Sequence, residues 1–161
     1  MEIKNATEKD FNNLQLIYKN AREFMVQNNN FLQWQDMVQL EKNVMSDIKN
    51  GNCYICLEKD VILGVFCFFV GKEPTYNKIY NGKWLNDKSY GVIHRIAVAV
   101  HNKGVASFCI KWCFNKFSNV KIDTHKDNIA MQKVILKNGF TYCGIIKKED
   151  GSQRLAYQKI N

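Results

Sequence analysis

Residues 98–107 join an apolar run to the start of a predicted helix, and they read Val98-Ala99-Val100-His101-Asn102-Lys103-Gly104-Val105-Ala106-Ser107. A glycine directly before a helix lets the backbone approach a ligand closely. The unpaired N–H groups of the first helical turn then face that ligand, and the helix dipole favours an anion there. The segment is therefore typical of a phosphate site, although an ordinary helix N-terminus shares these features and neither a P-loop nor a dinucleotide motif is present.

The segments on either side of this junction alternate between strand and helix patterns. Apolar residues over 92–100 and 120–124 predict two strands, with the helix that follows Gly104 between them. A strand–helix–strand unit of this kind forms a right-handed parallel crossover. The remaining predicted strands are a short one at Ile3 and two hairpins, which span 53–58 with 61–70 and 141–147 with 154–159.

Three further helices complete the predicted fold. They span 11–27, 36–49 and 128–138, and the first of them follows a capping-box pattern at Thr7–Asp10. The element order predicts a mixed α/β fold with a mostly antiparallel central sheet, one parallel β-α-β crossover and flanking helices. The length of 161 residues and the lack of a linker predict a single domain over 1–161.

Composition and charge narrow the class of protein. The longest apolar run, 61–70, is too short to cross a membrane, and the N-terminus has no signal-peptide pattern, so we expect a cytoplasmic protein without a membrane partner. The net charge is +8, but three arginines stand among 23 basic residues and no block of five lysines occurs. Nucleic-acid readers depend on arginine, so we expect no nucleic-acid partner.

The six cysteines do not predict a metal site. Cys53 and Cys56 have CxxC spacing, but they lie in a strand-like run and not before a helix. No two histidines are close in the sequence, so a zinc site would need cysteines from distant segments. We therefore expect buried thiols and no metal cofactor.

Two blocks of the chain resemble the GNAT N-acetyltransferase superfamily. The family's phosphate-loop pattern is Arg/Gln-x-x-Gly-x-Gly/Ala, and this chain has His101-x-x-Gly104-x-Ala106 after the strand Ile96-Ala97-Val98. The family's second pattern is Asn-x-x-Ala-x-x-Leu-Tyr-x-Lys-x-Gly-Phe, and this chain has Asn128-x-x-Met131-x-x-Val134 through Lys137-Asn138-Gly139-Phe140. The order and spacing of the elements agree with the family over nearly the whole chain.

The resemblance implies an enzyme that moves an acetyl group from acetyl-CoA to a primary amine by direct attack in a ternary complex. The pantetheine arm would pair with the backbone of Ile96, Ala97 and Val98, and the Asn128 side chain would hydrogen-bond the same arm. The pyrophosphate would lie on the backbone of Asn102, Lys103, Gly104, Val105, Ala106 and Ser107.

The chain departs from the family at two functional positions. His101 replaces the usual arginine or glutamine of the phosphate loop, and Ile135 stands where the family often has a general-acid tyrosine. A thiolate with a pKa of ~8.5 leaves without prior protonation, so losing the acid costs rate without forbidding the reaction. Tyr142 is a candidate substitute. The alternative function is a decayed GNAT-like domain that binds an acyl-CoA as a sensor or scaffold.

Two residues are candidates for the general base, of which we favour His94 and place Asp123 second. His94 lies two residues before Ile96, where some arylalkylamine-type acetyltransferases have a histidine, and histidine is the side chain that titrates nearest to neutral pH. Asp123 lies five residues before Asn128, where protein N-terminal acetyltransferases of the family have a glutamate. His125 is a weaker third candidate.

The acceptor pocket is expected between the first two helices and the long connection over 71–90. Aromatic side chains stand in these otherwise polar segments and predict an aromatic wall for a small-molecule amine or a peptide N-terminus; they are Phe31, Trp34, Tyr80, Trp84 and Tyr90. The resemblance is compatible with a homodimer, but no sequence feature predicts its interface.

Overall fold

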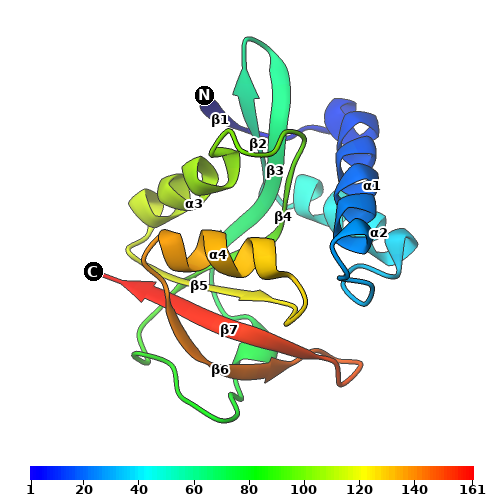
Figure 1. Cartoon of the computed structure of the whole chain (residues 1–161). Coiled ribbons are helices and arrows are strands. Elements are labelled where there is room, and N and C mark those ends of the chain that lie inside the picture. The colour runs from blue at the N-terminus through cyan, green and yellow to red at the C-terminus, as the bar shows by residue number, and fades with distance from the viewer.

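The computed structural model describes residues 1–161, and its elements follow the predicted order (Figure 1). The strands are β1 (Glu2–Asn5), β2 (Cys53–Glu58), β3 (Val61–Val70), β4 (Gly91–Val98), β5 (Asn119–Thr124), β6 (Thr141–Lys147) and β7 (Gln153–Ile160). The helices are α1 (Phe11–Gln27), α2 (Met37–Lys49), α3 (Val105–Lys116) and α4 (Ile129–Lys137), with short 3-10 turns η1 (Glu8–Asp10) and η2 (Pro74–Tyr76). None of the helices has the length and apolar character needed to cross a bilayer.

The seven strands form one sheet in the order β1-β2-β3-β4-β5-β7-β6. Every neighbouring pair is antiparallel except β4 and β5, which α3 connects as a parallel crossover. The predicted fold class is therefore confirmed. The predicted strand 92–100 ends earlier, at Val98, because the backbone turns through positive φ angles at Asn102 and Gly104 before α3 begins.

Two apolar cores hold the helices on opposite faces of the sheet. In Figure 1, α3 lies on the left and α1 and α2 on the right. One core joins α1 and α2 to β2–β4 through side chains such as Leu14, Val44 and Val65. The other joins α3 and α4 to β3–β5 and β7 through side chains such as Ile110 and Ile122. All six cysteines lie buried as free thiols, as expected.

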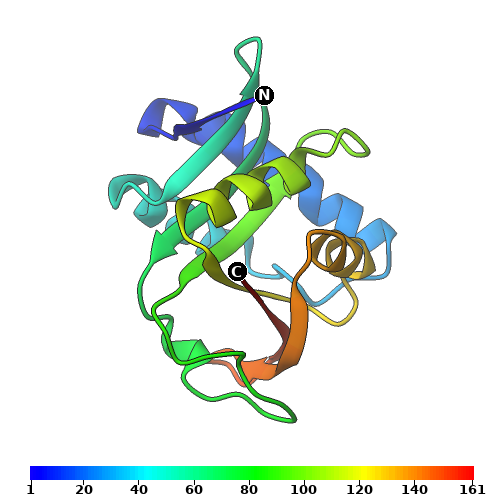
Figure 2. The ribbon, with the colours of Figure 1, turned by 90° about the vertical axis from the view of Figure 1, so that its left-hand side faces the viewer.

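The connection over 71–90 covers the part of the sheet that the α1–α2 pair leaves open, and Figure 2 shows it running below the strands. Its Tyr76 packs on Val92 of β4, Ile146 of β6 and Ala156 of β7. Tyr80 forms an isolated bridge with Ile145, with N···O distances of 2.8 Å in both directions. The connection is therefore an ordered part of the fold and not a loose loop.

Strands β4 and β5 separate after a short stretch of pairing. Gly91–Ile93 pairs with Val120–Ile122, and no later residue of β4 pairs with β5. From His94 to Val98, β4 pairs only with β3. One edge of β4 therefore keeps backbone N–H and C=O groups free of strand pairing, and such groups need other hydrogen-bond partners.

A bulge in β4 lies at the point where the two strands separate. Cys67 pairs with His94 and Val65 with Ala97, so two steps along β3 match three along β4. Arg95 takes up the extra residue and has a φ of 52°, which is uncommon for a residue other than glycine. The bulge therefore needs support from its surroundings.

That support comes from one contact with each helix of the α1–α2 pair. The Tyr18 hydroxyl of α1 donates to the carbonyl oxygen of Arg95 at 2.6 Å. The Arg95 guanidinium donates two hydrogen bonds to the Asp47 carboxylate of α2, at 2.7 and 2.9 Å. The strained residue is thus held on both its backbone and its side chain.

Candidate active site

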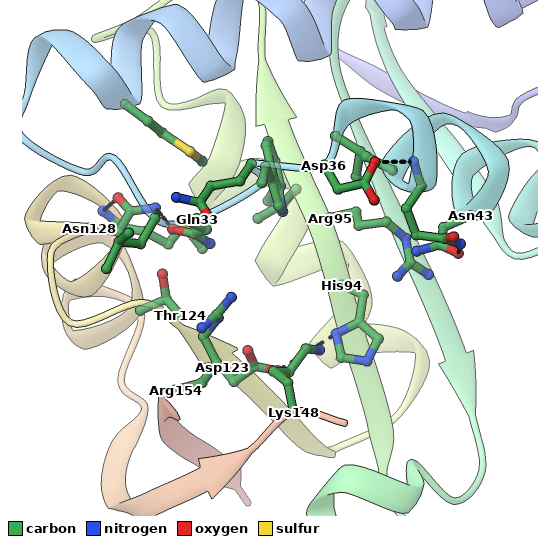
Figure 3. A pocket seen from close by; sticks show the side chains of 18 of the residues that line it. Gln33, Asp36, Asn43, His94, Arg95, Asp123, Thr124, Asn128, Lys148 and Arg154 are labelled. Carbon is green, nitrogen blue, oxygen red and sulfur yellow. Dashed lines mark hydrogen bonds and ion pairs between the residues drawn. The ribbon is translucent and has the colours of Figure 1, made fainter. Parts of the chain in front are cut away.

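A cavity of about 310 Å³ opens where β4 and β5 separate. Its lining comes from the α1–α2 connection, β4, β5, the start of α4 and the β6–β7 turn, as Figure 3 shows. A narrower and mostly apolar cavity of about 120 Å³ continues along β4 toward α3. Four residues line both cavities, so the two are continuous; they are Met25, Ile96, Asn128 and Met131.

His94 and Asp123, the two candidate bases, lie together on the floor of the larger cavity. They stand one step beyond the last β4–β5 pair, Ile93 with Ile122, so they occupy adjacent positions. The His94 Nδ1 atom is 3.7 Å from Asp123 Oδ2. Figure 3 shows both side chains inside the cavity. The sequence names them as alternatives, whereas the structure makes them neighbours.

Two residues of the connection over 71–90 complete this cluster, and the sequence analysis missed both. Glu73 Oε2 lies 3.0 Å from His94 Nε2, on the side away from Asp123. The Tyr76 hydroxyl donates to Asp123 Oδ2 at 2.7 Å. Neither residue belongs to a recognisable motif, and the one available signal was that long ordered connections are often functional.

The charges within the cluster determine which nitrogen of His94 carries a proton. Burial acts to raise the pKa of Glu73, but hydrogen bonds from His94 and Thr75 outweigh it and lower that pKa to about 2. The carboxylate is therefore charged at neutral pH and accepts the Nε2–H of His94. In the uncharged tautomer that has its proton on Nε2, the lone pair is on Nδ1, the nitrogen nearer to Asp123.

We predict that Glu73→Gln weakens the acid sensitivity of the fold. The folded pKa of about 2 lies below the ordinary 4.5, so the stabilisation is present above pH 4.5 and lost as the pH falls toward 2. By linkage the wild type loses stability as the pH falls through this window, by at most about 2 kcal/mol at pH 3 because solvent screens the partly exposed carboxylate. Urea unfolding at pH 7, 4 and 3 measures the difference. Glu23→Gln, at an exposed residue of α1, should keep the wild-type slope, and equal slopes for Glu73→Gln would contradict the assignment.

His125, the third candidate, does not reach either cavity. Its side chain is buried, and its Nδ1 accepts a hydrogen bond from the Asp127 N–H at 3.1 Å. Burial, with a smaller effect of the Arg154 charge, lowers the pKa of His125. The His125 side chain therefore stabilises the turn before α4 through this hydrogen bond.

The structure does not bring Tyr142 to the cluster, and this expectation needs correction. Tyr142 lies on the edge strand β6, 48% exposed, with its ring 5.6 Å from that of Tyr157. Tyr157 pairs with Ile122, so both point to the α3–α4 face, whereas Asp123 points to the other face. A side chain on the wrong face of a strand cannot donate a proton in this cavity.

The expected aromatic wall is also largely wrong. Trp34 alone lines the larger cavity, and its ring lies edge-on to Tyr18 at 5.4 Å. Phe31 is 51% exposed and lines neither cavity. The remaining three aromatic residues, Tyr80, Trp84 and Tyr90, pack beneath the sheet with the rest of the connection over 71–90. The connection over 71–90 packs against β5–β7 instead of covering the cavity opening. The cavity is therefore lined mainly by amide and charged side chains instead of aromatic ones.

The residues expected to hold acetyl-CoA lie along the narrow cavity and at its end. Ile96, Ala97 and Val98 line it from the unpaired edge of β4. Gly104 has a φ of 72° at the start of α3, and a Cβ there would meet nothing within 4 Å. No side chain caps this helix, so its first N–H groups, from Val105 on, have no intrahelical or capping partner.

The remaining positions of the phosphate loop are exposed or already hydrogen-bonded. Asn102 and Lys103 lie at the surface, and Asn102 has a φ of 61°. Ala106 lines the narrow cavity, and the Ser107 hydroxyl accepts a hydrogen bond from Asn138 at 2.9 Å. His101, the departure from the family pattern, stacks on Phe24 of α1 at 4.0 Å and so closes one side of the narrow cavity.

Asn128 lines both cavities, and the oxygen and the nitrogen of its side-chain amide each make a hydrogen bond. Its Oδ1 accepts from the Met131 N–H at 3.1 Å, which caps α4, and its Nδ2 donates to Gln33 Oε1 at 2.9 Å. One hydrogen of Nδ2 stays free for a further acceptor. The residues present therefore fit an extended acyl-CoA arm, while no group of three or more His, Cys, Asp or Glu side chains that could hold a metal ion occurs.

Comparison with known proteins agrees with this geometry. No family model and no curated protein sequence matches the chain. Among solved structures, a GNAT-family acetyltransferase from Streptococcus agalactiae superposes with a TM-score of 0.90 at 29% identity, covering 99% of this chain and 95% of that one. A putative acetyltransferase from Staphylococcus aureus has a TM-score of 0.74 at 20% identity and covers 99% of each chain.

A third solved structure extends the comparison to a protein with a named acceptor. A ribosomal-protein-alanine N-acetyltransferase from Brucella melitensis superposes with a TM-score of 0.63 at 17% identity, covering 100% of each chain. Each of these three likenesses covers at least 99% of this chain. In its fold, and over 99% of its length, the chain is therefore similar to GNAT-family acetyltransferases of known structure.

Proposed function

We propose that this protein transfers an acetyl group from acetyl-CoA to the primary amine of a small molecule or a peptide N-terminus, with His94 as the general base. The observation that carries the proposal is the position of His94. His94 lines the cavity where β4 leaves β5, next to the unpaired edge of β4, and its Nδ1 lies 3.7 Å from Asp123 Oδ2. The proposed base, His94, thus lies next to the backbone edge of β4 that would bind the acetyl-CoA arm.

The acetyl thioester supplies the electrophilic carbonyl carbon. The amine nitrogen forms a bond to that carbon, the C–S bond breaks, and CoA leaves as its thiolate, which takes the second proton that the acylated nitrogen loses. The ammonium form of the acceptor must first lose a proton, and His94 Nδ1 takes it. Asp123 Oδ2, at 3.7 Å from Nδ1, provides a negative charge that binds the ammonium in front of His94.

Glu73 and Tyr76 act as positioning residues in this proposal. Glu73 accepts the Nε2–H of His94 and so keeps the lone pair on Nδ1. Burial and the neighbouring Asp123 carboxylate raise the pKa of Tyr76 well above its ordinary value, so its hydroxyl stays protonated and holds Asp123 in place. The arrangement orients both groups that touch the acceptor amine.

Acetyl-CoA binding is tested through the start of α3. We predict that Gly104→Val greatly reduces the rise in melting temperature that acetyl-CoA produces, because a β-branched side chain is strained at a φ of 72° and crowds the N–H groups there. Gly51→Val is the matched control, since Gly51 has the same φ of 72° and also no neighbour within 4 Å but follows α2. At 100 times its dissociation constant, a ligand adds about 2.7 kcal/mol of stability.

Differential scanning fluorimetry with acetyl-CoA, and with ATP as an anionic control, reads this effect. We expect the wild type and Gly51→Val to be stabilised by acetyl-CoA and not by ATP. An equal rise with both ligands, or an unchanged rise in Gly104→Val, would show that this helix start does not hold the cofactor.

The residue type at position 135 favours one alternative function, a domain that binds an acyl-CoA without turnover. Isoleucine has no acidic proton, and Ile135 lies buried in the α3–α4 core, so the usual acid position of the family has a packing role in this chain. Release of free CoA thiol over a panel of amines distinguishes the two functions. Stabilisation by acetyl-CoA with no thiol release would favour the binding domain.

A further inference from the structure

The charged groups around the larger cavity are unevenly paired. Each carboxylate there already accepts a hydrogen bond: Asp123 from Tyr76, Asp36 from the Gln39 N–H, and Asp150 from the N–H and hydroxyl of Ser152. Among the cations, Arg95 is paired with Asp47. The other two, Lys148 and Arg154, have no carboxylate within ion-pair distance.

Strand register places Arg154 close to the candidate catalytic pair. Asp123 pairs with Ala156, and Arg154 is two residues from Ala156 on β7, so Arg154 and Asp123 share a face of the sheet. The two positions are diagonal neighbours, one row apart along the strands, which is roughly 7 Å. Arg154 donates only to its own turn, to the Gln153 carbonyl at 2.9 Å and the Ser152 hydroxyl at 3.4 Å.

Lys148 continues the same row of side chains toward the turn. Ile146 pairs directly with Arg154, and Lys148 follows directly after the end of β6 and lines the same cavity as Arg154. Its ammonium makes no hydrogen bond or ion pair, and both basic residues are only partly exposed. Figure 3 shows Lys148 and Arg154 in the same part of the cavity as Asp123 and His94.

We propose that the acceptor is an amine that carries a carboxylate, in which the ammonium binds at Asp123 and His94 and the carboxylate binds at Arg154 and Lys148. This inference rests on the proposed acetyl transfer and names the substrate class of that site. The planar guanidinium can bind a carboxylate through two parallel hydrogen bonds, and the ammonium of Lys148 adds a second positive charge. A polyamine would place a second positive charge against these two cations, which disfavours it.

The test compares matched amines that differ only in the carboxylate. Glycine, β-alanine and γ-aminobutyrate vary the spacing between the two charges, their amides remove the negative charge, and spermidine represents polyamines. We expect kcat/KM for one of the amino acids to exceed that for its amide by roughly 10- to 100-fold, the range of a hydrogen-bonded charge. Arg154→Gln should raise KM for that amino acid by a similar factor and leave kcat/KM for its amide unchanged.

Lys148→Gln should also raise KM for that amino acid, by a smaller factor than Arg154→Gln. Lys133→Gln, at an exposed position of α4, removes a positive charge away from the cavity and is the control. Equal use of amino acids and amides, preference for spermidine, or an equal loss on both substrates in Arg154→Gln would overturn the inference. If no amine releases CoA, the proposed transfer itself fails. Melting temperatures with CoA plus each amine then still test the site, because equal shifts for an amino acid and its amide would overturn the carboxylate assignment.

Discussion

His94→Gln is expected to lower kcat by about 10²–10⁴-fold while leaving the affinity for acetyl-CoA unchanged. Glutamine keeps a polar side chain of similar length, but it cannot accept the amine proton that Nδ1 of His94 takes. In the proposed function the cofactor binds at the unpaired edge of β4 and the start of α3, neither of which depends on the imidazole. Steady-state kinetics for thiol release and the thermal shift with acetyl-CoA measure the two quantities separately.

The pH–rate profile separates His94 from Asp123 as the base. The acidic limb of kcat/KM should disappear in His94→Gln and persist in Asp123→Asn, which should instead raise KM for the amine. His125→Gln is the control, since His125 lies outside both cavities. Unchanged turnover and an unchanged profile in His94→Gln would show that the base assignment is wrong.

Asp47→Ala is expected to lower the free energy of unfolding by about 3 kcal/mol, because it leaves the Arg95 guanidinium partly buried without its partner. The pair is well shielded, with 20% of the Arg95 side chain and 13% of the Asp47 side chain exposed. Arg95 also has a φ of 52°, so the ion pair holds a strained position in β4. Urea unfolding at pH 7 measures the loss.

A double variant tests whether the loss comes from the stranded charge. Asp47→Ala with Arg95→Met removes both charges and should recover most of the stability, whereas acetyl-CoA affinity should be lower than in the wild type in both variants because the bulge has lost its side-chain anchor. Glu2→Ala, which breaks the exposed pair with Lys4, should cause no measurable change. A loss in Asp47→Ala as small as that of Glu2→Ala would contradict the role of the ion pair.

The β4–α3–β5 unit shows how much local pattern can predict. Apolar runs at 92–98 and 120–124 and the glycine before α3 are local signals, and the structure has a parallel crossover at this place. Chain handedness leaves one way to connect two parallel neighbours through a helix. The fold class and the helix start at Gly104 were therefore predictable before any coordinate was known.

Tyr142 and Tyr76 show that a local sequence pattern does not predict which tyrosine side chain reaches the cavity. Tyr142 looked suitable because it follows Gly139 and Phe140, but alternation along β6 turns it to the α3–α4 face. Tyr76, which no motif marks, reaches Asp123 across 47 positions of sequence. Whether a side chain can enter a cavity depends on strand register and on the course of a long connection, and neither is contained in a short motif.

The chain's apolar periodicity, its turn residues and the glycine of residues 98–107 thus predict the elements, their order and the place of an anion, because each depends on neighbours within a few positions. His94 and Asp123 were likewise identifiable as chemical groups. Their pairing with Glu73 and Tyr76, and the row of cations beside them, required the tertiary structure. Those contacts join residues from separate strands and from the connection over 71–90, and only the packing of the whole sheet brings them within hydrogen-bond distance.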